Sequence, residues 1–264
     1  MTTRPARRSP WEVQRSVFVA LLLREMQARV GGQWIGALWT FFEPLAHMLL
    51  MVTVMGFFRG SVMPGIEYPL FLATGLVPFF LYQNLAMRLM DGIEANRGLF
   101  AYRQVQPLDP LLSRSVVEIL MNSIVYAFTL IVLAYAGLHV LPALPLQVLA
   151  VQCLIALMGT AVGIVFAVVG HDRPRTKTLL RMLFFPLYMI TGVIFPVDFL
   201  PRETLDWLLW NPMLHAVELS RHAFVPEYVP VEGVNGLYPT MFTLAALWLG
   251  LALYRADRQR LTAG

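Results

Sequence analysis

The chain has 264 residues, of which 58% are hydrophobic and 14% are charged, well below the roughly 25% of charged residues in a soluble domain. Between Glu118 and Asp172 it runs for 53 residues without a charged side chain, enough for two membrane-spanning helices of roughly 20 residues each. These features exclude a soluble protein and indicate an integral membrane protein. The single cysteine, Cys153, excludes an intrachain disulfide and a thiol metal cluster.

Residues 1–34 are predicted to be a cytoplasmic N-terminus with an interface helix. Residues 11–29 are rich in good helix formers and contain no Gly or Pro. The apolar stretch 17–23 imitates a signal peptide, but Arg24 and Glu25 stand where small residues precede a cleavage site. We therefore expect a retained helix at the inner membrane surface, because so short an apolar stretch does not span a bilayer.

A transmembrane domain of six helices is predicted over residues 35–255, with 256–264 as a cytoplasmic tail. The apolar windows place these helices at about 35–58, 68–88, 116–138, 146–170, 177–196 and 237–255. Pro142 and Pro145 separate the two helices of the long uncharged run. The fifth helix is the least regular, because it contains Pro186.

The basic residues orient this arrangement. Of the 20 Lys and Arg residues, 17 fall on one side of the predicted membrane, and only Arg59, Arg202 and Arg221 fall on the other. Cytoplasmic loops carry an excess of Lys and Arg. Both termini are therefore predicted to be cytoplasmic, and the net charge of +4 reflects topology and does not indicate nucleic-acid binding.

The chain lacks a phosphate-binding loop. Its only lysine, Lys177, precedes Thr178, but His171 and Thr176 stand where that loop requires glycine. We predict that the chain is not an enzyme and that any ATP hydrolysis belongs to a separate subunit.

Glu43 is a carboxylate inside the first predicted span, which costs roughly 2.5–3.5 kcal/mol on insertion scales. Pro44 follows it, and His47 lies four residues further on. Two interpretations stay open: a hydrogen-bonded structural pair of Glu43 with His47, or a polar position facing a conduit.

Two polar segments lie outside the spans. His215, Glu218 and His222 share one face of a predicted helix, which indicates either a metal site or, as we favour, an ordinary polar face, so no metal is predicted. Residues 91–103 mix charges with aromatic side chains. They are typical of either a short helix facing a cytosolic partner or an ordinary solvated loop.

The order of motifs over nearly the whole chain resembles the ABC-2 type permeases that export capsular polysaccharide, the KpsM type. The matching segments are Arg24-Glu-Met with Arg29, Gly36-Ala-Leu-Trp39, Glu43-Pro44 with His47, Tyr68-Pro-Leu-Phe-Leu, Glu94-Ala-Asn-Arg-Gly-Leu, Thr191-Gly-Val-Ile-Phe-Pro196, and Trp210-Asn-Pro with His215, Glu218 and Arg221. Permeases for O-antigen and teichoic acid share the broader pattern.

This resemblance implies an all-α, type V exporter-like half-transporter with six membrane helices in the bacterial inner membrane. It implies pairing with a second copy and with two ATPase subunits, which hold the ATP and magnesium, while this chain binds no cofactor. It makes 91–103 the coupling helix that docks on the ATPase. The candidate coupling residues are Glu94, Asn96, Arg97 and Tyr102.

The resemblance also implies a conduit and an outer gate. Conduit-lining candidates are Trp39, Phe41, Phe42, Glu43, Phe184, Phe185 and Tyr188, although for any single ring we favour a place in the lipid or the core. The outer loop 198–236 would re-enter the membrane, and its gate candidates are Trp207, Trp210, His215, Glu218 and Arg221.

The implied cargo is a lipid-linked capsular polysaccharide, passed on to a periplasm-spanning adaptor and an outer-membrane exporter. The alternatives are a permease for O-antigen, teichoic acid or a small drug, and a membrane enzyme acting on lipid-linked sugars. An enzyme would need several acids or histidines converging on one site. The candidates, Glu43 with His47 and the 215–222 face, fall on opposite sides of the predicted membrane.

Overall fold

A computed structural model describes residues 9–30, 34–58 and 66–262, with the backbone alone described at positions 30, 34–37, 40–41, 44 and 55–58. These residues form helices joined by turns, and no β-strand occurs among them. The side chain of Phe41 lies outside the described part.

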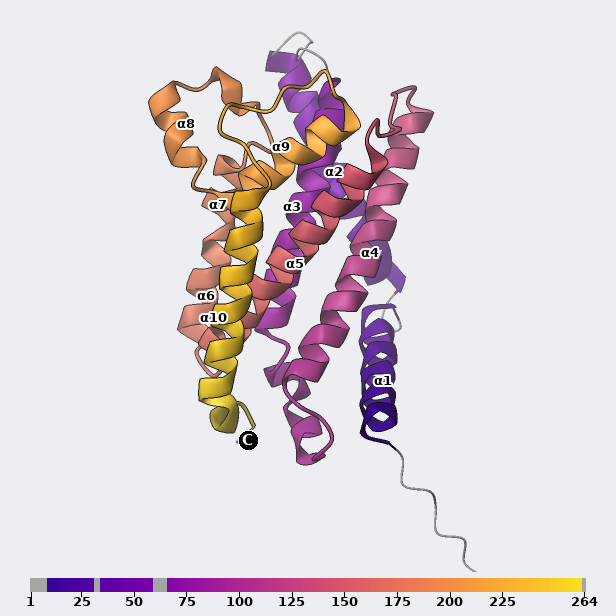
Figure 1. The fold of residues 1–264 in the computed structure, drawn as a ribbon. Helices are drawn as coiled ribbons and strands as arrows, with labels where there is room; N and C mark the ends of the chain where they lie inside the picture. The colour runs from indigo at the N-terminus through magenta and orange to yellow at the C-terminus, as the bar shows by residue number, and fades with distance from the viewer. Residues whose placement is uncertain (1–8, 31–33, 59–65, 263–264) are drawn as a thin grey trace, which may run out of the picture.

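The long helices and the short ones alternate along the chain (Figure 1). The elements are α1 (Pro10–Val30), α2 (Trp34–Phe58), α3 (Tyr68–Met90), the 3-10 helix η1 (Glu94–Ala101), α4 (Leu108–Tyr135), α5 (Pro145–Gly170), α6 (Pro174–Met182), α7 (Phe184–Ile190), the 3-10 turn η2 (Val197–Phe199), α8 (Arg202–Leu208), α9 (Pro212–Phe224) and α10 (Leu237–Thr262).

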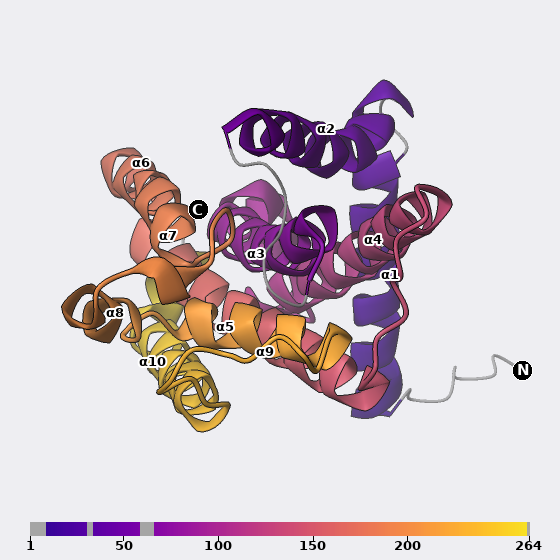
Figure 2. The ribbon, with the colours of Figure 1, turned by 90° about the horizontal axis from the view of Figure 1, so that it is seen from above.

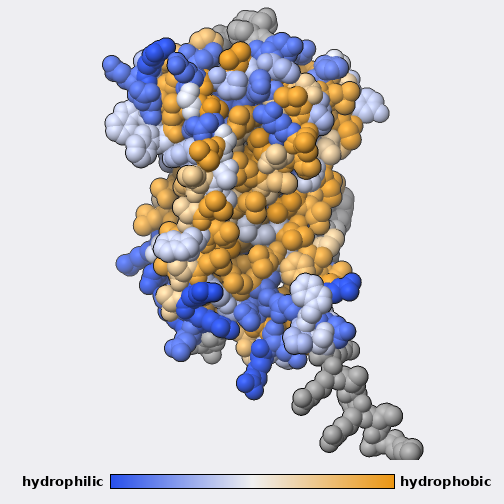
Figure 3. Space-filling model, viewed as in Figure 1, coloured by the Kyte–Doolittle hydropathy of each residue, from blue (hydrophilic) through white to orange (hydrophobic). Residues whose placement is uncertain are grey.

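Four of the described helices are long and apolar enough to cross a membrane: Tyr68–Met90, Leu108–Tyr135, Pro145–Gly170 and Leu237–Leu261. Within α2, Leu45–Val54 forms a shorter apolar stretch. On the face seen in Figure 3, apolar residues fill the middle of the molecule and polar residues gather at both ends. This distribution is expected for a protein whose middle lies in lipid.

The core lies where α3 packs against α5. Gly159 and Gly163, one turn apart on α5, let the two backbones approach closely, because a Cβ at either position would lie 3.0 or 2.9 Å from the Cβ of Leu85 or Leu89 on α3. Small residues four apart are a common device for close helix contact in membranes. The contact makes α3 and α5 the fixed frame of the bundle.

Two helices extend well beyond their predicted bounds, and in α4 the added turns carry polar residues that are paired. The span expected over 116–138 begins at Leu108. Its first turns are charged, and α1 supplies partners: Gln14 donates to Asp109 at 2.7 Å, and Arg114 donates to both carboxylate oxygens of Glu25 at 2.9 and 3.0 Å. The last span, expected to end at 255, continues to Thr262.

The fifth predicted span, 177–196, is not one straight helix. Pro186 has no N–H to donate to the carbonyl of Met182, and its ring crowds that carbonyl. α6 therefore ends at Met182, and α7 begins at Phe184. Leu183 and Leu187 still make the bonds to Leu179 and Leu183 across the junction. We describe α6 and α7 as one helix kinked by proline, which ends before Gly192, at a φ of +70° that favours glycine.

The polar elements occupy the two ends of the bundle. In Figure 1, α1, the region after α3 and the end of α10 lie at one end, whereas α8 and α9 lie at the other. Seen from above, α1, α2, α3 and α4 group on one side and α6, α7, α8 and α10 on the other, with α5 between them (Figure 2).

Candidate functional site

The segment expected to be the coupling helix over 91–103 forms the 3-10 helix η1, from Glu94 to Ala101. Asp91 ends α3, and the turn that follows packs Gly92 against Leu111, where a Cβ would lie 2.5 Å from Leu111 Cδ2. This tight turn holds η1 against the end of the bundle.

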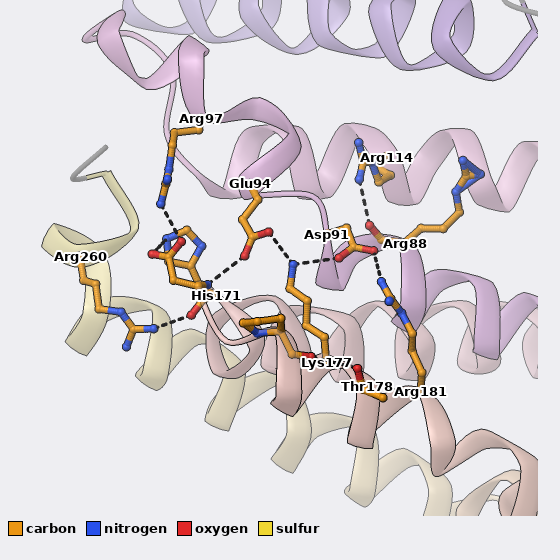
Figure 4. Close-up of polar contacts among 12 residues, drawn as sticks. Arg88, Asp91, Glu94, Arg97, Arg114, His171, Lys177, Thr178, Arg181 and Arg260 are labelled. Atoms are coloured by element: carbon orange, nitrogen blue, oxygen red, sulfur yellow. Dashed lines mark hydrogen bonds and ion pairs between the residues drawn. The ribbon is translucent and has the colours of Figure 1, made fainter.

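A group of ion pairs, here called the η1–α6 ion cluster, joins this turn and η1 to α6 (Figure 4). It comprises Asp91, Glu94, Arg97, Asp172, Lys177 and Arg181. The Lys177 Nζ, on a side chain that is 9% exposed, donates to Asp91 at 2.9 Å and to Glu94 at 2.7 Å. One turn later, Arg181 donates to the other oxygen of Asp91 at 2.7 Å. Lys177 therefore connects a carboxylate at the end of α3 and a carboxylate of η1 to the helix that leads into α7.

These pairs keep the acids ionised. Burial raises the pKa of Asp91, but the hydrogen bonds and charges of Lys177 and Arg181 outweigh it and hold that pKa below its usual range. Burial likewise raises the pKa of Glu94, and Lys177 together with the backbone N–H of Asp172 brings it below the usual value. Both carboxylates are thus charged at neutral pH.

The turn between α5 and α6 is held from two sides. The Asp172 N–H donates to Glu94 at 2.9 Å, and Arg97 donates to the Asp172 carboxylate at 2.8 Å. Asp172 has a φ of +55°, a conformation that Asp tolerates better than most residues. From α10, Arg260 donates to the carbonyl of His171 at 2.8 Å. The turn is therefore a junction of η1, α6 and α10.

The same junction offers metal-ligating atoms. One ligand atom each from Glu94, His171 and Asp172 lie within 4.8 Å of one another. Burial lowers the pKa of His171, outweighing the charges of Asp172 and Glu94 that raise it, so the ring is neutral at pH 7. However, Lys177 and Arg97 already neutralise the two carboxylates. The junction is better described as an ion-pair cluster than as a metal site.

The coupling candidates divide by exposure. Asn96 is 2% exposed, accepts a hydrogen bond from Arg24 of α1 at 2.7 Å and donates to the Gly92 carbonyl at 2.8 Å. Its role is to hold η1 in place. Tyr102, by contrast, is 65% exposed. Arg97 is exposed but paired with Asp172.

The conduit candidates come from α2 and α7. Trp39, Phe42, Glu43 and Phe185 are exposed on this single chain, whereas Phe184 and Tyr188 are buried. The link between the two helices is His47, whose Nε2 lies 2.7 Å from the Tyr188 hydroxyl.

The outer-gate candidates also divide. Trp207 and Trp210 are exposed, while His215, Glu218 and Arg221 point into the protein. His215 accepts the Asn235 N–H at Nδ1, at 3.1 Å, so its Nε2 donates to the Leu209 carbonyl at 2.8 Å. This ring is therefore a structural link between the segment before α9, at Leu209, and the segment before α10, at Asn235.

The α9 buried cluster consists of Glu218, Arg221 and Tyr228. Arg221 donates to Glu218 at 2.9 Å and to the Gly192 and Val193 carbonyls at 2.8 and 3.2 Å, and its guanidinium lies 3.4 Å from the centre of the Phe71 ring. Tyr228 donates to both oxygens of Glu218, at 2.9 and 3.0 Å. Because Glu218 and Arg221 are both 0% exposed, they do not line a passage in this conformation. They tie α9 to the end of α7.

Comparison with known proteins decides the family. The family model described as ABC-2 type transporter matches residues 16–225, which runs from α1 to the end of α9. The chain belongs to the ABC-2 type transporter family.

The relatives within this ABC-2 family are similar over nearly their whole length. The polysialic acid transport protein KpsM of Escherichia coli is 39% identical over 252 residues, covering 96% of this chain and 97% of that protein. The capsule polysaccharide export inner-membrane protein CtrC of Neisseria meningitidis serogroup A is 31% identical over 91% of each chain. The protein BexB of Haemophilus influenzae, with the same description, is 30% identical over 92% of this chain and 91% of that protein.

Sequence reasoning about this ABC-2 chain missed the partners of its coupling residues. In the sequence, Asp91 and Asp172 serve only as bounds of segments. Lys177 serves as one of the 17 basic residues on the predicted cytoplasmic side and in the test for a phosphate-binding loop. Two signals were present: Lys177 is the only lysine of the chain, and Asp91 and Glu94 are three residues apart. Neither signal shows that the groups meet, because 83 to 86 residues separate Lys177 from these acids.

Proposed function

We propose that this chain is the membrane-spanning permease subunit of an ABC transporter that exports lipid-linked capsular polysaccharide across the inner membrane. The observation that carries the proposal is the 39% identity to the polysialic acid transport protein KpsM over 96% of this chain. The capsule export proteins CtrC and BexB support the same class of cargo.

In this proposal the chain crosses the membrane six times, through α2, α3, α4, α5, the kinked α6–α7 helix and α10. The 25 residues of α2 reach about 37 Å at 1.5 Å per residue, against a hydrocarbon core of about 30 Å. α1 lies along the inner surface, where it pairs with charged residues of α4. Both termini are cytoplasmic, in keeping with the distribution of Lys and Arg.

The proposed assembly contains two copies of this chain and two ATPase subunits. The ATPase subunits bind ATP and magnesium, since this chain has no phosphate-binding loop. A periplasm-spanning adaptor and an outer-membrane exporter receive the polysaccharide. α2 and α7 of the two copies line the conduit, and α8 and α9 close its outer end.

η1 and the residue that follows it, Tyr102, form the proposed docking element for the ATPase, and the residues of this element have different roles. Tyr102 is exposed and suits direct contact with a partner. Glu94 is bonded to Lys177 of α6 and suits transmission of movement into the kinked helix. A displacement of η1 would therefore reach α7 through the η1–α6 ion cluster.

The cargo is tested in cells whose copy of this gene is deleted. Mass analysis of the glycan on its lipid carrier should show capsular repeat units accumulating inside the cell, and reintroducing the gene should clear them. Accumulation of O-antigen or teichoic acid would assign the chain to that alternative cargo. Absence of any accumulating glycan would overturn the proposal.

The roles within η1 are tested on the complex purified with its ATPase subunit. Tyr102→Ala should release the ATPase during purification. Lys177→Ala should retain the ATPase and lower export, whereas Lys177→Arg, which keeps the charge, should export normally. Arg202→Ala removes a charge from an exposed pair in the outer region and serves as the matched control. Normal export by Lys177→Ala would contradict transmission through the η1–α6 ion cluster.

A further inference from the structure

The peptide group between His171 and Asp172 is held from both of its sides. Its carbonyl accepts a hydrogen bond from Arg260 of α10 at 2.8 Å, and its N–H donates to Glu94 of η1 at 2.9 Å. The C=O and N–H of a trans peptide point in opposite directions, so α10 and η1 reach this one group from opposite sides (Figure 4). We call these four residues the 171–172 peptide clamp.

The orientation of this peptide depends on hydrogen bonds to its backbone. The His171 ring is buried, and neither ring nitrogen makes a hydrogen bond to the described residues. Asp172 has a φ of +55°, which residues other than glycine seldom adopt. A turn with this backbone needs its surroundings to hold it, and Arg260 and Glu94 supply the two bonds that do so.

The end of α10 is a fixed part of the bundle. A Cβ at Gly250 would lie 3.0 Å from Ile164 Cγ2, so α10 packs closely on α5. Tyr254 and Leu261 are both buried, which holds the turns beyond the predicted membrane boundary at 255 against the protein. Arg260 therefore stands on a helix end that has little freedom to move.

Asp257, one turn before Arg260, orients the guanidinium. Arg260 Nη1 donates to Asp257 Oδ2 at 3.0 Å, while Nη2 donates to the His171 carbonyl. The N–H donors of arginine lie in a rigid plane, so the bond to Asp257 also sets the direction of Nη2. The positive charge polarises the peptide and makes its N–H a better donor to Glu94. The two bonds of the clamp thus strengthen each other.

Glu94 connects the clamp to α6. One of its oxygens accepts from the Asp172 N–H, and the other accepts from Lys177 Nζ at 2.7 Å. α6 begins at Pro174, directly after the held turn, so this turn is the end about which α6 can tilt. When the turn stays fixed, a displacement of η1 acts on Lys177 and tilts α6, and α7 moves with it. When the turn is loose, it follows η1 and the tilt is reduced.

We infer that Arg260 is a positioning residue for the coupling of ATP hydrolysis to export, and that it acts by keeping the 171–172 peptide fixed to α10 while η1 moves. This inference rests on the proposed function, because it assigns the last turn of α10 a part in passing movement from the ATPase to the membrane helices. Arg260 touches neither the ATPase nor the cargo in this role.

The clamp is tested by residue-resolved hydrogen exchange on the transporter purified with its ATPase subunit in lipid nanodiscs. Arg260→Ala should speed the exchange of the Asp172 N–H on the order of 10-fold, since the peptide loses a hydrogen bond to a charged group. Arg260→Lys, which can still donate to the carbonyl, should stay closer to wild type. Arg255→Ala is the matched control, because it removes the same charge from an exposed position near the same end of α10. Unchanged exchange in Arg260→Ala would overturn the inference.

The coupling role is tested in proteoliposomes that contain the same complexes and the lipid-linked glycan extracted from the deletion strain. Arg260→Ala should hydrolyse ATP at the wild-type rate but export several-fold less glycan for each ATP hydrolysed. Arg260→Lys should restore most of this ratio, and Arg255→Ala should leave it unchanged. A merely structural role would instead lower both rates together with the melting temperature.

The outcomes separate this inference from the proposed function. Faster exchange at Asp172 with a wild-type ratio of glycan to ATP would leave the clamp without a part in coupling and overturn the inference alone. A parallel loss of hydrolysis, export and melting temperature would make Arg260 a residue of general stability, again overturning it. Failure of the wild-type complex to export the glycan would overturn the proposed cargo, while the exchange measurement would still decide whether Arg260 fixes the peptide.

Discussion

The α9 buried cluster and the η1–α6 ion cluster are built from the same kinds of side chain but in opposite surroundings. In the first, the side chains of Glu218 and Arg221 are both 0% exposed. In the second, Lys177 is 9% exposed while its partners Asp91 and Glu94 are 42% and 36% exposed. The α9 buried cluster is closed to water, whereas in the η1–α6 ion cluster water reaches the carboxylates of Asp91 and Glu94.

This difference sets what each cluster can do. Removing one partner of a buried pair leaves an uncompensated charge, at a cost of about 3–5 kcal/mol, so we expect the α9 buried cluster to stay closed during a transport cycle. Partly exposed pairs are worth about 0.2–1 kcal/mol each, because water replaces a lost partner. The η1–α6 ion cluster can therefore break and re-form, as a moving joint requires.

The largest expected effect on stability comes from breaking the α9 buried cluster. Arg221→Leu should lower the free energy of unfolding by about 3–5 kcal/mol, because Glu218 is left buried without its cation. Denaturant unfolding of the purified protein in detergent measures this free energy. Glu218→Leu should cost a similar amount, and the double variant should cost less than the sum of the two, since it leaves no lone charge. Additive losses would show that the two groups act independently.

A smaller effect should follow from crowding the same cluster without changing its charges. A Cβ at Gly75 of α3 would lie 2.8 Å from the Arg221 guanidinium and 3.3 Å from Val217. Gly75→Ala should therefore cost about 1–3 kcal/mol through overpacking, measured as above. Gly98→Ala is the control, because no atom of the described residues lies within 4 Å of the added methyl group. Equal stability of both variants would mean that the guanidinium can shift, and that the cluster is less rigid than its burial indicates.

Much of the helix bundle can be predicted from the sequence, because the length of each apolar segment limits where a helix can cross the membrane. The helix expected over 68–88 runs from Tyr68 to Met90, and the one expected over 146–170 runs from Pro145 to Gly170. Pro186 signalled the irregular fifth span, although the sequence did not show that its hydrogen bonds continue across the kink. The start of α4 was misplaced, because Asp109 and Arg114 look like loop residues until α1 supplies their partners.

The candidate sites were harder to predict, because they depend on which groups meet. The helical spacing of His215, Glu218 and His222 predicts one polar helix face, and Arg221 is a gate candidate only through the family resemblance. Spacing does not tell whether such a face points to a passage or into the protein. The η1–α6 ion cluster joins residues from two segments that lie far apart in the chain, 91–97 and 172–181. One sequence without relatives cannot pair Lys177 with Asp91 in advance.

The stability that the η1–α6 ion cluster gives the protein should depend on pH. The pKa values of Asp91 and Glu94 are held below their usual range. Their contribution to the stability of the folded protein is therefore fully present above the ordinary carboxylate pKa of about 4. It is lost as the pH falls through the lowered pKa values. Lys177→Ala should thus destabilise the protein by about 1 kcal/mol at pH 7, and the difference from wild type should shrink below about pH 4. Thermal unfolding across this pH range measures it. A difference that persists in acid would show that Lys177 acts through the hydrophobic contacts of its side chain.

The smallest effect is expected at Arg202, whose pair with Glu232 is 3.4 Å long and about nine-tenths exposed on both sides. Arg202→Ala should change the free energy of unfolding by less than about 0.5 kcal/mol, since water and salt already screen both charges. Unfolding at low and high salt measures it, and raising the salt should narrow even this small difference. Were Arg202→Ala to cost as much as Arg221→Leu, burial would not be what separates a fixed cluster from a movable one. The assignment of the η1–α6 ion cluster as the moving joint would then lose its physical basis.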